Sequence, residues 1–172
     1  DLIKISELRI INNVPEEVQQ RLEEFVANYP DDKEGFYLLG SYSRGRENYQ
    51  AAVDAMTKAI ELDPFFKMAY NDLAYSFDEL GNSEKSIWAI NKYISLAPGE
   101  ANPYDTRGDL YAKHGKLSEA ADSYRHALAI KPDFYESLEK LGQISAYLKE
   151  TLQLRTYIQN IPLSIWQCGI VI

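Results

Sequence analysis

The chain has 172 residues, 45% apolar and 26% charged, which is typical of a folded protein and not of a disordered one. Its net charge of −8 and pI of about 4.8 argue against a DNA- or RNA-binding face, because such a face needs clustered Lys and Arg. Cys168 is the only cysteine, so no intrachain disulfide can form, and no apolar run is long enough to span a membrane as a helix.

Four prolines, Pro30, Pro64, Pro98 and Pro132, lie 34 residues apart. Each follows an apolar segment of helical character, and proline ends a helix because it lacks an N–H group and restricts the residue before it. A fixed period of this kind is typical of repeat proteins. The prolines therefore predict equivalent helical units, each ending at the same place.

The predicted elements follow this period. Residues 2–11 are predicted as either a helix or a strand, because leucine and isoleucine at three-residue spacing compete with a high β-branched content. A helix is predicted at 15–29. Three antiparallel helix pairs follow, at 33–46 with 49–62, at 67–81 with 84–96, and at 101–114 with 117–130. A clear helix is expected at 135–148 and a weaker one at 151–160, and the remaining residues form an apolar, irregular tail.

Within this period, small, bulky and proline residues recur at fixed places, and their pattern resembles the tetratricopeptide repeat, a 34-residue helix–turn–helix. The matching residues are Phe36, Leu39, Gly40, Ala52, Met56, Ala59 and Pro64; then Tyr70, Leu73, Ala74, Phe77, Ile90 and Pro98; then Tyr104, Gly108, Tyr111, Ala120, Tyr124, Ala127 and Pro132; and last Leu138, Leu141 and Gly142. Ser43, Ser86, Tyr93 and Arg107 depart from the family pattern.

The expected fold is therefore an all-α, right-handed α-solenoid of antiparallel helix–turn–helix hairpins. We expect a degenerate N-terminal repeat or cap at 1–32 and repeats at 33–66, 67–100 and 101–134. A partial C-terminal repeat or capping helices should occupy 135–160, with the tail at 161–172. Stacking is needed because one hairpin cannot bury its apolar side alone.

The resemblance implies a concave groove, lined by the first helix of each hairpin, that holds a peptide or helix of a partner protein. The residues expected to contact that partner are Tyr37, Arg44, Asn71, Asp72, Tyr75, Glu79, Asn102, Asp105, Asp109, Glu136, Glu139 and Lys140.

The predicted groove positions carry more acids than bases. The acids are residues 34, 72, 78, 79, 105, 109, 136 and 139, and the bases are 44, 113 and 140. This excess predicts a partner segment that contains Lys or Arg. In the competing interpretation the carboxylates only keep an exposed face soluble. The family members that grip a chaperone C-terminus use a cationic clamp, and the corresponding positions here, such as Tyr37, Ser41 and Asp72, do not form one.

Motifs for chemistry are absent from the sequence. His114 and His126 fall on different helices with no second ligand at metal-binding spacing, so both are expected to be solvated or packed at the edge of a helix, and not metal ligands. The segment from Gly40 to Gly45 has the glycine spacing of a phosphate loop but lacks the Lys-Ser/Thr ending. Cys168 has no basic neighbour that would activate it. We therefore expect no cofactor, no metal and no catalytic residue.

The leading hypothesis is a non-catalytic adaptor that binds another protein. Two alternatives are a structural module that self-associates, as a homodimer through its terminal helices or apolar tail, and a regulatory segment of a larger, possibly enzymatic protein. The chain begins at Asp1 and not at a methionine, which keeps the second alternative open. Without a visible signal peptide, a cytoplasmic location is expected.

Overall fold

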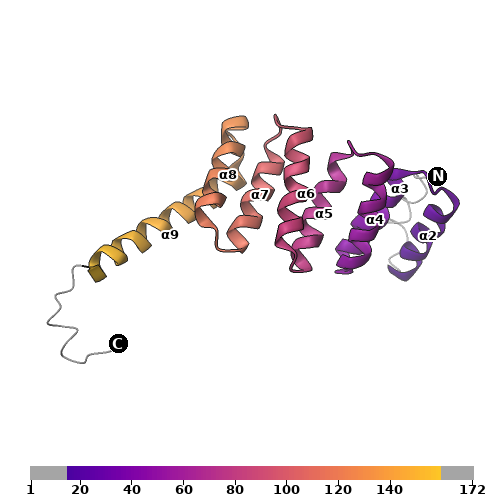
Figure 1. Cartoon of the computed structure of the whole chain (residues 1–172), viewed down its shortest axis with the longest axis horizontal. Helices are drawn as coiled ribbons and strands as arrows, with labels where there is room; N and C mark the ends of the chain where they lie inside the picture. The colour runs from indigo at the N-terminus through magenta and orange to yellow at the C-terminus, as the bar shows by residue number, and fades with distance from the viewer. Residues whose placement is uncertain (1–14, 160–172) are drawn as a thin grey trace, which may run out of the picture.

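The computed structural model describes residues 15–159, and the regular structure in this range is entirely α-helical (Figure 1). The helices are α2 (Pro15–Asn28), α3 (Lys33–Gly45), α4 (Tyr49–Leu62), α5 (Lys67–Glu79), α6 (Ser83–Leu96), α7 (Asn102–Lys113), α8 (Leu117–Ile130) and α9 (Tyr135–Gln159). The predictions for residues 2–11 and for the tail at 161–172, including Cys168, lie outside the described residues.

Side-chain caps begin three of these helices. Asp32 accepts a hydrogen bond from the Gly35 N–H at 2.7 Å, and Asn82 accepts one from the Lys85 N–H at 3.1 Å. Asn48 caps α4 in the same way. Each cap satisfies one of the N–H groups that a helix start leaves without a partner.

A left-handed residue makes the turn inside each hairpin. These residues are Glu47, Gly81 and Gly115, with φ values of 61°, 75° and 71°, and they lie 34 residues apart. Glycine adopts this conformation without the steric cost that a side chain adds, so Glu47 is the strained member of the series. The turn therefore repeats with the same period as the prolines.

The three hairpins α3–α4, α5–α6 and α7–α8 stack side by side in chain order, and α2 and α9 lie at the two ends (Figure 1). Each second helix packs on its own first helix and on the first helix of the next hairpin. The first helices also contact one another, α3 with α5 and α5 with α7. They therefore form a continuous inner layer, and the described chain is an all-α solenoid.

Small residues on the first helices allow this packing. A Cβ added to Gly40 would lie 2.9 Å from the Met56 side chain, and one added to Gly108 would fall on the Tyr124 ring. Met56 and Tyr124 are themselves fully buried on the second helices. Missing side chains on one helix thus make room for large ones on the other, as close packing requires.

The C-terminal end differs from the expectation of two helices at 135–148 and 151–160. A single helix, α9, runs from 135 to 159 without a turn. The reason is that Lys149 and Glu150 stand where the second hairpin has Gly81 and Asn82. Straight-chain residues such as lysine and glutamate favour helix, whereas the Gly-Asn pair stops one.

Replacing Gly108 with Ala should destabilise the protein by about 1–3 kcal/mol, because the added methyl group meets a fully packed ring. The Tyr124 ring is also anchored by its OH, which donates a hydrogen bond to Asp109 at 2.7 Å, so it cannot swing aside without a further loss. Urea unfolding measures the change. Gly45→Ala is the control, because nothing lies within 4 Å of its added Cβ at the end of α3. Equal stabilities for the two variants would contradict the packing account.

Candidate partner-binding groove

The residues predicted to contact a partner all fall on first helices. They are Tyr37 and Arg44 on α3, Asn71, Asp72, Tyr75 and Glu79 on α5, Asn102, Asp105 and Asp109 on α7, and Glu136, Glu139 and Lys140 on α9. Most of them join polar clusters that link one hairpin to the next.

The first cluster joins α3 to α5. Arg44 Nη2 lies 3.5 Å from Asp72 Oδ1, and the guanidinium carbon sits 5.9 Å from the centre of the Tyr75 ring. Asp72 is buried, and this burial raises the pKa of its carboxyl, while the charge of Arg44 partly offsets the rise. Asp72 is therefore an internal acid and not part of an open acidic surface.

Two clusters join α5 to α7. Thr106 donates a hydrogen bond to Asn71 Oδ1 at 3.2 Å and accepts one from the Tyr75 hydroxyl at 3.4 Å. At the other end of α5, the buried Asp78 carboxylate lies 2.7 Å from Lys113 Nζ and 2.6 Å from His114 Nε2. Lys113 also contacts Glu79 at 2.8 Å. The role of His114 is thus a structural contact between hairpins.

The last cluster joins α7 to α9 and is centred on Lys140. Its ammonium group donates hydrogen bonds to Asp105 at 2.9 Å and to Asp109 at 2.8 Å. Ser137 donates to the other oxygen of Asp105 at 2.6 Å, and Tyr124 donates to Asp109. Burial alone would lower the pKa of Lys140, but these carboxylates raise it above its ordinary value.

These contacts change the prediction of an acidic groove. The three basic residues, Arg44, Lys113 and Lys140, all pair with carboxylates, and the acids that they pair with are Asp72, Asp78, Glu79, Asp105 and Asp109. Three of those acids, Asp72, Asp78 and Asp105, are buried. The acids therefore do more than keep an exposed face soluble, because most of them hold neighbouring hairpins together.

The remaining predicted residues are more accessible. Asn102, Glu136 and Glu139 are exposed near the starts of α7 and α9. Tyr37 is half-buried, with its ring 5.2 Å from that of Phe66 in an edge-on contact. The accessible part of the predicted site thus carries carboxylates on α9 and an amide on α7.

Several residues predicted at groove or hairpin positions have partners that the sequence pattern did not indicate. Asp78 and Lys113 are 35 residues apart, as are Asp105 and Lys140, and each pair bridges neighbouring hairpins. That spacing is one repeat plus one residue, so an acid and a base at this spacing could have indicated an ion pair between neighbouring units. Ser137 and Tyr124 complete the Lys140 cluster, but their hydrogen bonds have no sequence motif.

A hollow lies between α4, α5 and α6. It has a volume of about 960 Å³. Its lining is mixed, with Val53, Phe77 and the half-exposed Trp88 beside the charged Glu84 and Lys85. Among the described residues, no group of His, Cys, Asp and Glu could hold a metal ion. No helix within 15–159 is long and apolar enough to cross a bilayer.

Comparison with known proteins identifies the repeat. Family models described as "TPR repeat" and "Tetratricopeptide repeat" match residues 108–147 and residues 19–65 and 37–101. The crystal structure of MamA is 30% identical in sequence with a TM-score of 0.68, and the alignment covers 77% of each chain. The chain belongs to the tetratricopeptide repeat family.

Two further proteins show what else resembles this chain. Tetratricopeptide repeat protein 16 of Mus musculus is 29% identical over 62% of this chain, and the match spans only 16% of the mouse protein. The first tetratricopeptide domain of Spaghetti (RPAP3), solved with the HSP90 peptide SRMEEVD, is 23% identical with a TM-score of 0.63. That alignment covers 68% of this chain and 93% of the other, and it supports the fold alone.

Replacing Lys140 with Met should destabilise the protein by about 1–3 kcal/mol, because the buried Asp105 carboxylate would lose its cationic partner. Chemical denaturation at neutral pH measures the loss. Lys58→Met is the matched control, since the Lys58–Glu61 pair is exposed and should contribute no more than about 1 kcal/mol. A Lys140 variant as stable as the control would show that the cluster does not stabilise the stack.

The ion pair between Lys67 and Glu100 predicts a pH dependence. Hydrogen bonds from Lys67 and then from Tyr93 hold the pKa of Glu100 below its ordinary value of 4.5. The folded pKa is below the unfolded one, so this stability is present above pH 4.5 and is lost as the pH falls through the folded value.

In Lys67→Met the pKa of Glu100 should move back toward 4.5, so acidification should cost the variant less stability than it costs the wild type. Unfolding midpoints measured at neutral pH and at a pH below 4.5 test this. Lys58→Met should keep the wild-type pH dependence. The idea fails if the wild type and Lys67→Met lose the same stability on acidification.

Proposed function

We propose that this chain is a non-catalytic protein-interaction scaffold that holds a peptide or helix of a partner along the face formed by α3, α5, α7 and the start of α9. Membership in the tetratricopeptide repeat family supports the scaffold role, as does the peptide-bound state of the RPAP3 domain that shares this fold. The polar clusters support the choice of face, because they fix the first helices relative to one another. A groove with fixed walls loses little conformational entropy when a partner binds.

The partner segment should carry Lys or Arg. The observation behind this is that Arg44, Lys113 and Lys140 are already paired with carboxylates, whereas Glu136 and Glu139 are exposed at one end of the face. An approaching cation meets accessible carboxylates, and an approaching anion meets cations that are already neutralised. Complementary charge of this kind acts mainly on the association rate and on selectivity.

The same pairing argues against an acidic partner such as the HSP90 peptide bound by the RPAP3 domain. A peptide carboxylate would have to displace an internal carboxylate from a basic residue. At Lys140 the displaced carboxylate would be that of Asp105, which would then be buried without its cation. The cytoplasmic location and the role of the chain in a longer protein stay predictions.

The test is a peptide array whose members have equal length and apolar content but differ in charge. The wild type should retain Lys/Arg-containing peptides over their Asp/Glu counterparts, and Glu136→Lys/Glu139→Lys should lose that preference. Both positions are exposed, so the fold should survive the change. Substitution of buried Asp72 would be unsuitable, because it would break the contact with Arg44.

Glu23→Lys/Glu119→Lys is the matched control. It makes the same change in net charge at exposed positions on α2 and α8, away from the first-helix face. Its preference should match the wild type at equal salt. Equal loss in both double variants would mean that net charge and not the groove selects the peptide, and no charge preference in the wild type would reject the proposed partner chemistry.

A further inference from the structure

The first helix of the last unit has an unfilled place for a second helix. Gly40, Ala74, Gly108 and Gly142 occupy the same position in successive units, 34 residues apart. In the complete hairpins the residue sixteen positions later packs there, and an added Cβ on Gly40 or Gly108 would meet that residue, Met56 or Tyr124. Beside Gly142 nothing lies within 4 Å.

The turn that would bring the second helix back is also missing. Glu47, Gly81 and Gly115 have left-handed φ values, and the next position in the series is Lys149, which is helical. As a result α9 continues straight, and its C-terminal half projects from the stack (Figure 1). By the sequence period this projecting half, 151–159, corresponds to the start of a second helix, with Leu154 aligned to Ala120 and Ile158 to Tyr124.

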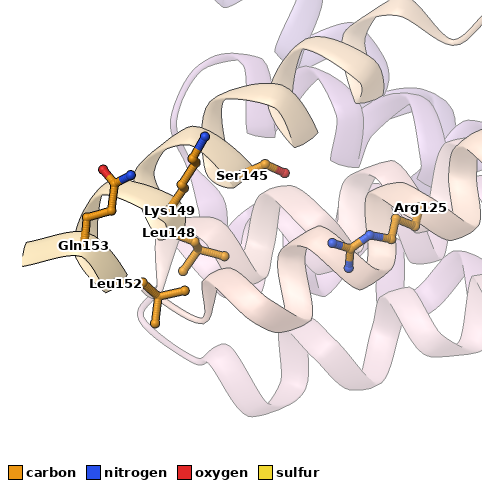
Figure 2. A pocket seen from close by; sticks show the side chains of 6 residues that line it. All are labelled: Arg125, Ser145, Leu148, Lys149, Leu152 and Gln153. Atoms are coloured by element: carbon orange, nitrogen blue, oxygen red, sulfur yellow. The ribbon is translucent and has the colours of Figure 1, made fainter. Parts of the chain in front are cut away.

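A pocket marks the place where a second helix would pack. Arg125 of α8 forms one side of it, and Leu148 and Leu152 line it from α9, across a volume of about 580 Å³ (Figure 2). Leu152 is 63% exposed, and Leu148 is half-buried. Exposed apolar side chains on a solenoid end are stabilised when another apolar helix covers them.

We propose that a second copy of this chain fills this place by reciprocal exchange. Residues 151–159 of each copy pack on residues 135–148 and on α8 of the other, so that two chains complete two hairpins in trans. The occupant follows from the register, because 151–159 aligns with 117–125 at the start of α8. This alignment places Ile158 where Tyr124 packs beside Gly108, although Leu154 stands where α8 has the small Ala120. In its own chain α9 continues without a turn, so that segment does not fold back onto residues 135–148.

Exchange of identical elements requires no new interface chemistry, because each copy receives the contacts that its own hairpin would have made. The symmetry is two-fold and closed, so the assembly stops at a dimer. Within 135–148 the pocket is lined by Ser145 and Leu148 and not by Glu136 and Glu139 of the groove. The proposal does not depend on the proposed peptide binding.

Light scattering during size exclusion tests the proposal on the full chain. The wild type should show a concentration-dependent mass that approaches twice the 19.7 kDa of one chain. Lys149→Gly/Glu150→Asn copies the turn of Gly81 and Asn82, so the hairpin should close within one chain and the mass should return to that of a monomer. Lys92→Gly, an exposed helix position on α6, is the control for the lower helix propensity and should remain dimeric.

A second variant tests the unfilled place beside Gly142. Gly142→Leu fills the space beside Gly142 and should abolish the dimer without loss of helicity, since nothing lies within 4 Å of its Cβ in the free chain. Gln143→Leu adds an apolar side chain at the next exposed position, on another side of α9, and should leave the dimer intact.

Three outcomes would overturn the proposal. A wild type that is monomeric at every concentration would mean that no second copy fills the place beside Gly142. A Lys149→Gly/Glu150→Asn variant that remains dimeric would place the interface elsewhere, as would a Gly142→Leu variant that remains dimeric. Circular dichroism of each variant separates loss of the dimer from loss of the fold.

Discussion

The hairpins depend on the close approach of two helices where the first helix has a very small residue and the second a large one. Gly40 faces Met56, and Gly108 faces Tyr124, in each case sixteen residues apart. The contact leaves no room for a single methyl group beside the Tyr124 ring. Everything else in the fold follows from it, because stacked hairpins share faces only if each hairpin has the same shape.

Electrostatic contacts add a second layer of order between hairpins. Asp72, Asp78 and Asp105 are buried acids on first helices, and each pairs with a base on a neighbouring first helix or at its end. Such acids would be costly to bury alone, so the pairing sets how adjacent hairpins align. The carboxylates that remain accessible to a partner are mostly Glu136 and Glu139 on α9, at the end of the series of ion pairs.

The helices were predictable because their ends are marked by residues with strict backbone demands. Proline closes each second helix, and Gly81 and Asn82 form a turn that few other pairs would make. The resemblance to the tetratricopeptide repeat placed the predicted contact residues on the first helices, where they are found, and their role in binding stays a prediction. Its internal pairing was not predicted, because counting charges ignores distance, and the unbroken α9 was not predicted, because a lysine at position 149 looks ordinary unless compared with the turn residue one repeat earlier.

Asp109 has a consequence for how the molecule comes apart. Its carboxylate accepts a hydrogen bond from Tyr124 within its own hairpin and another from Lys140 of the following unit. One group thus couples folding inside a unit to the presence of its neighbour. In a linear array such nearest-neighbour terms decide cooperativity, so melting of α9 should loosen α7 and α8 before it reaches α3 and α4. Unfolding of the array should therefore proceed stepwise from the α9 end toward α3.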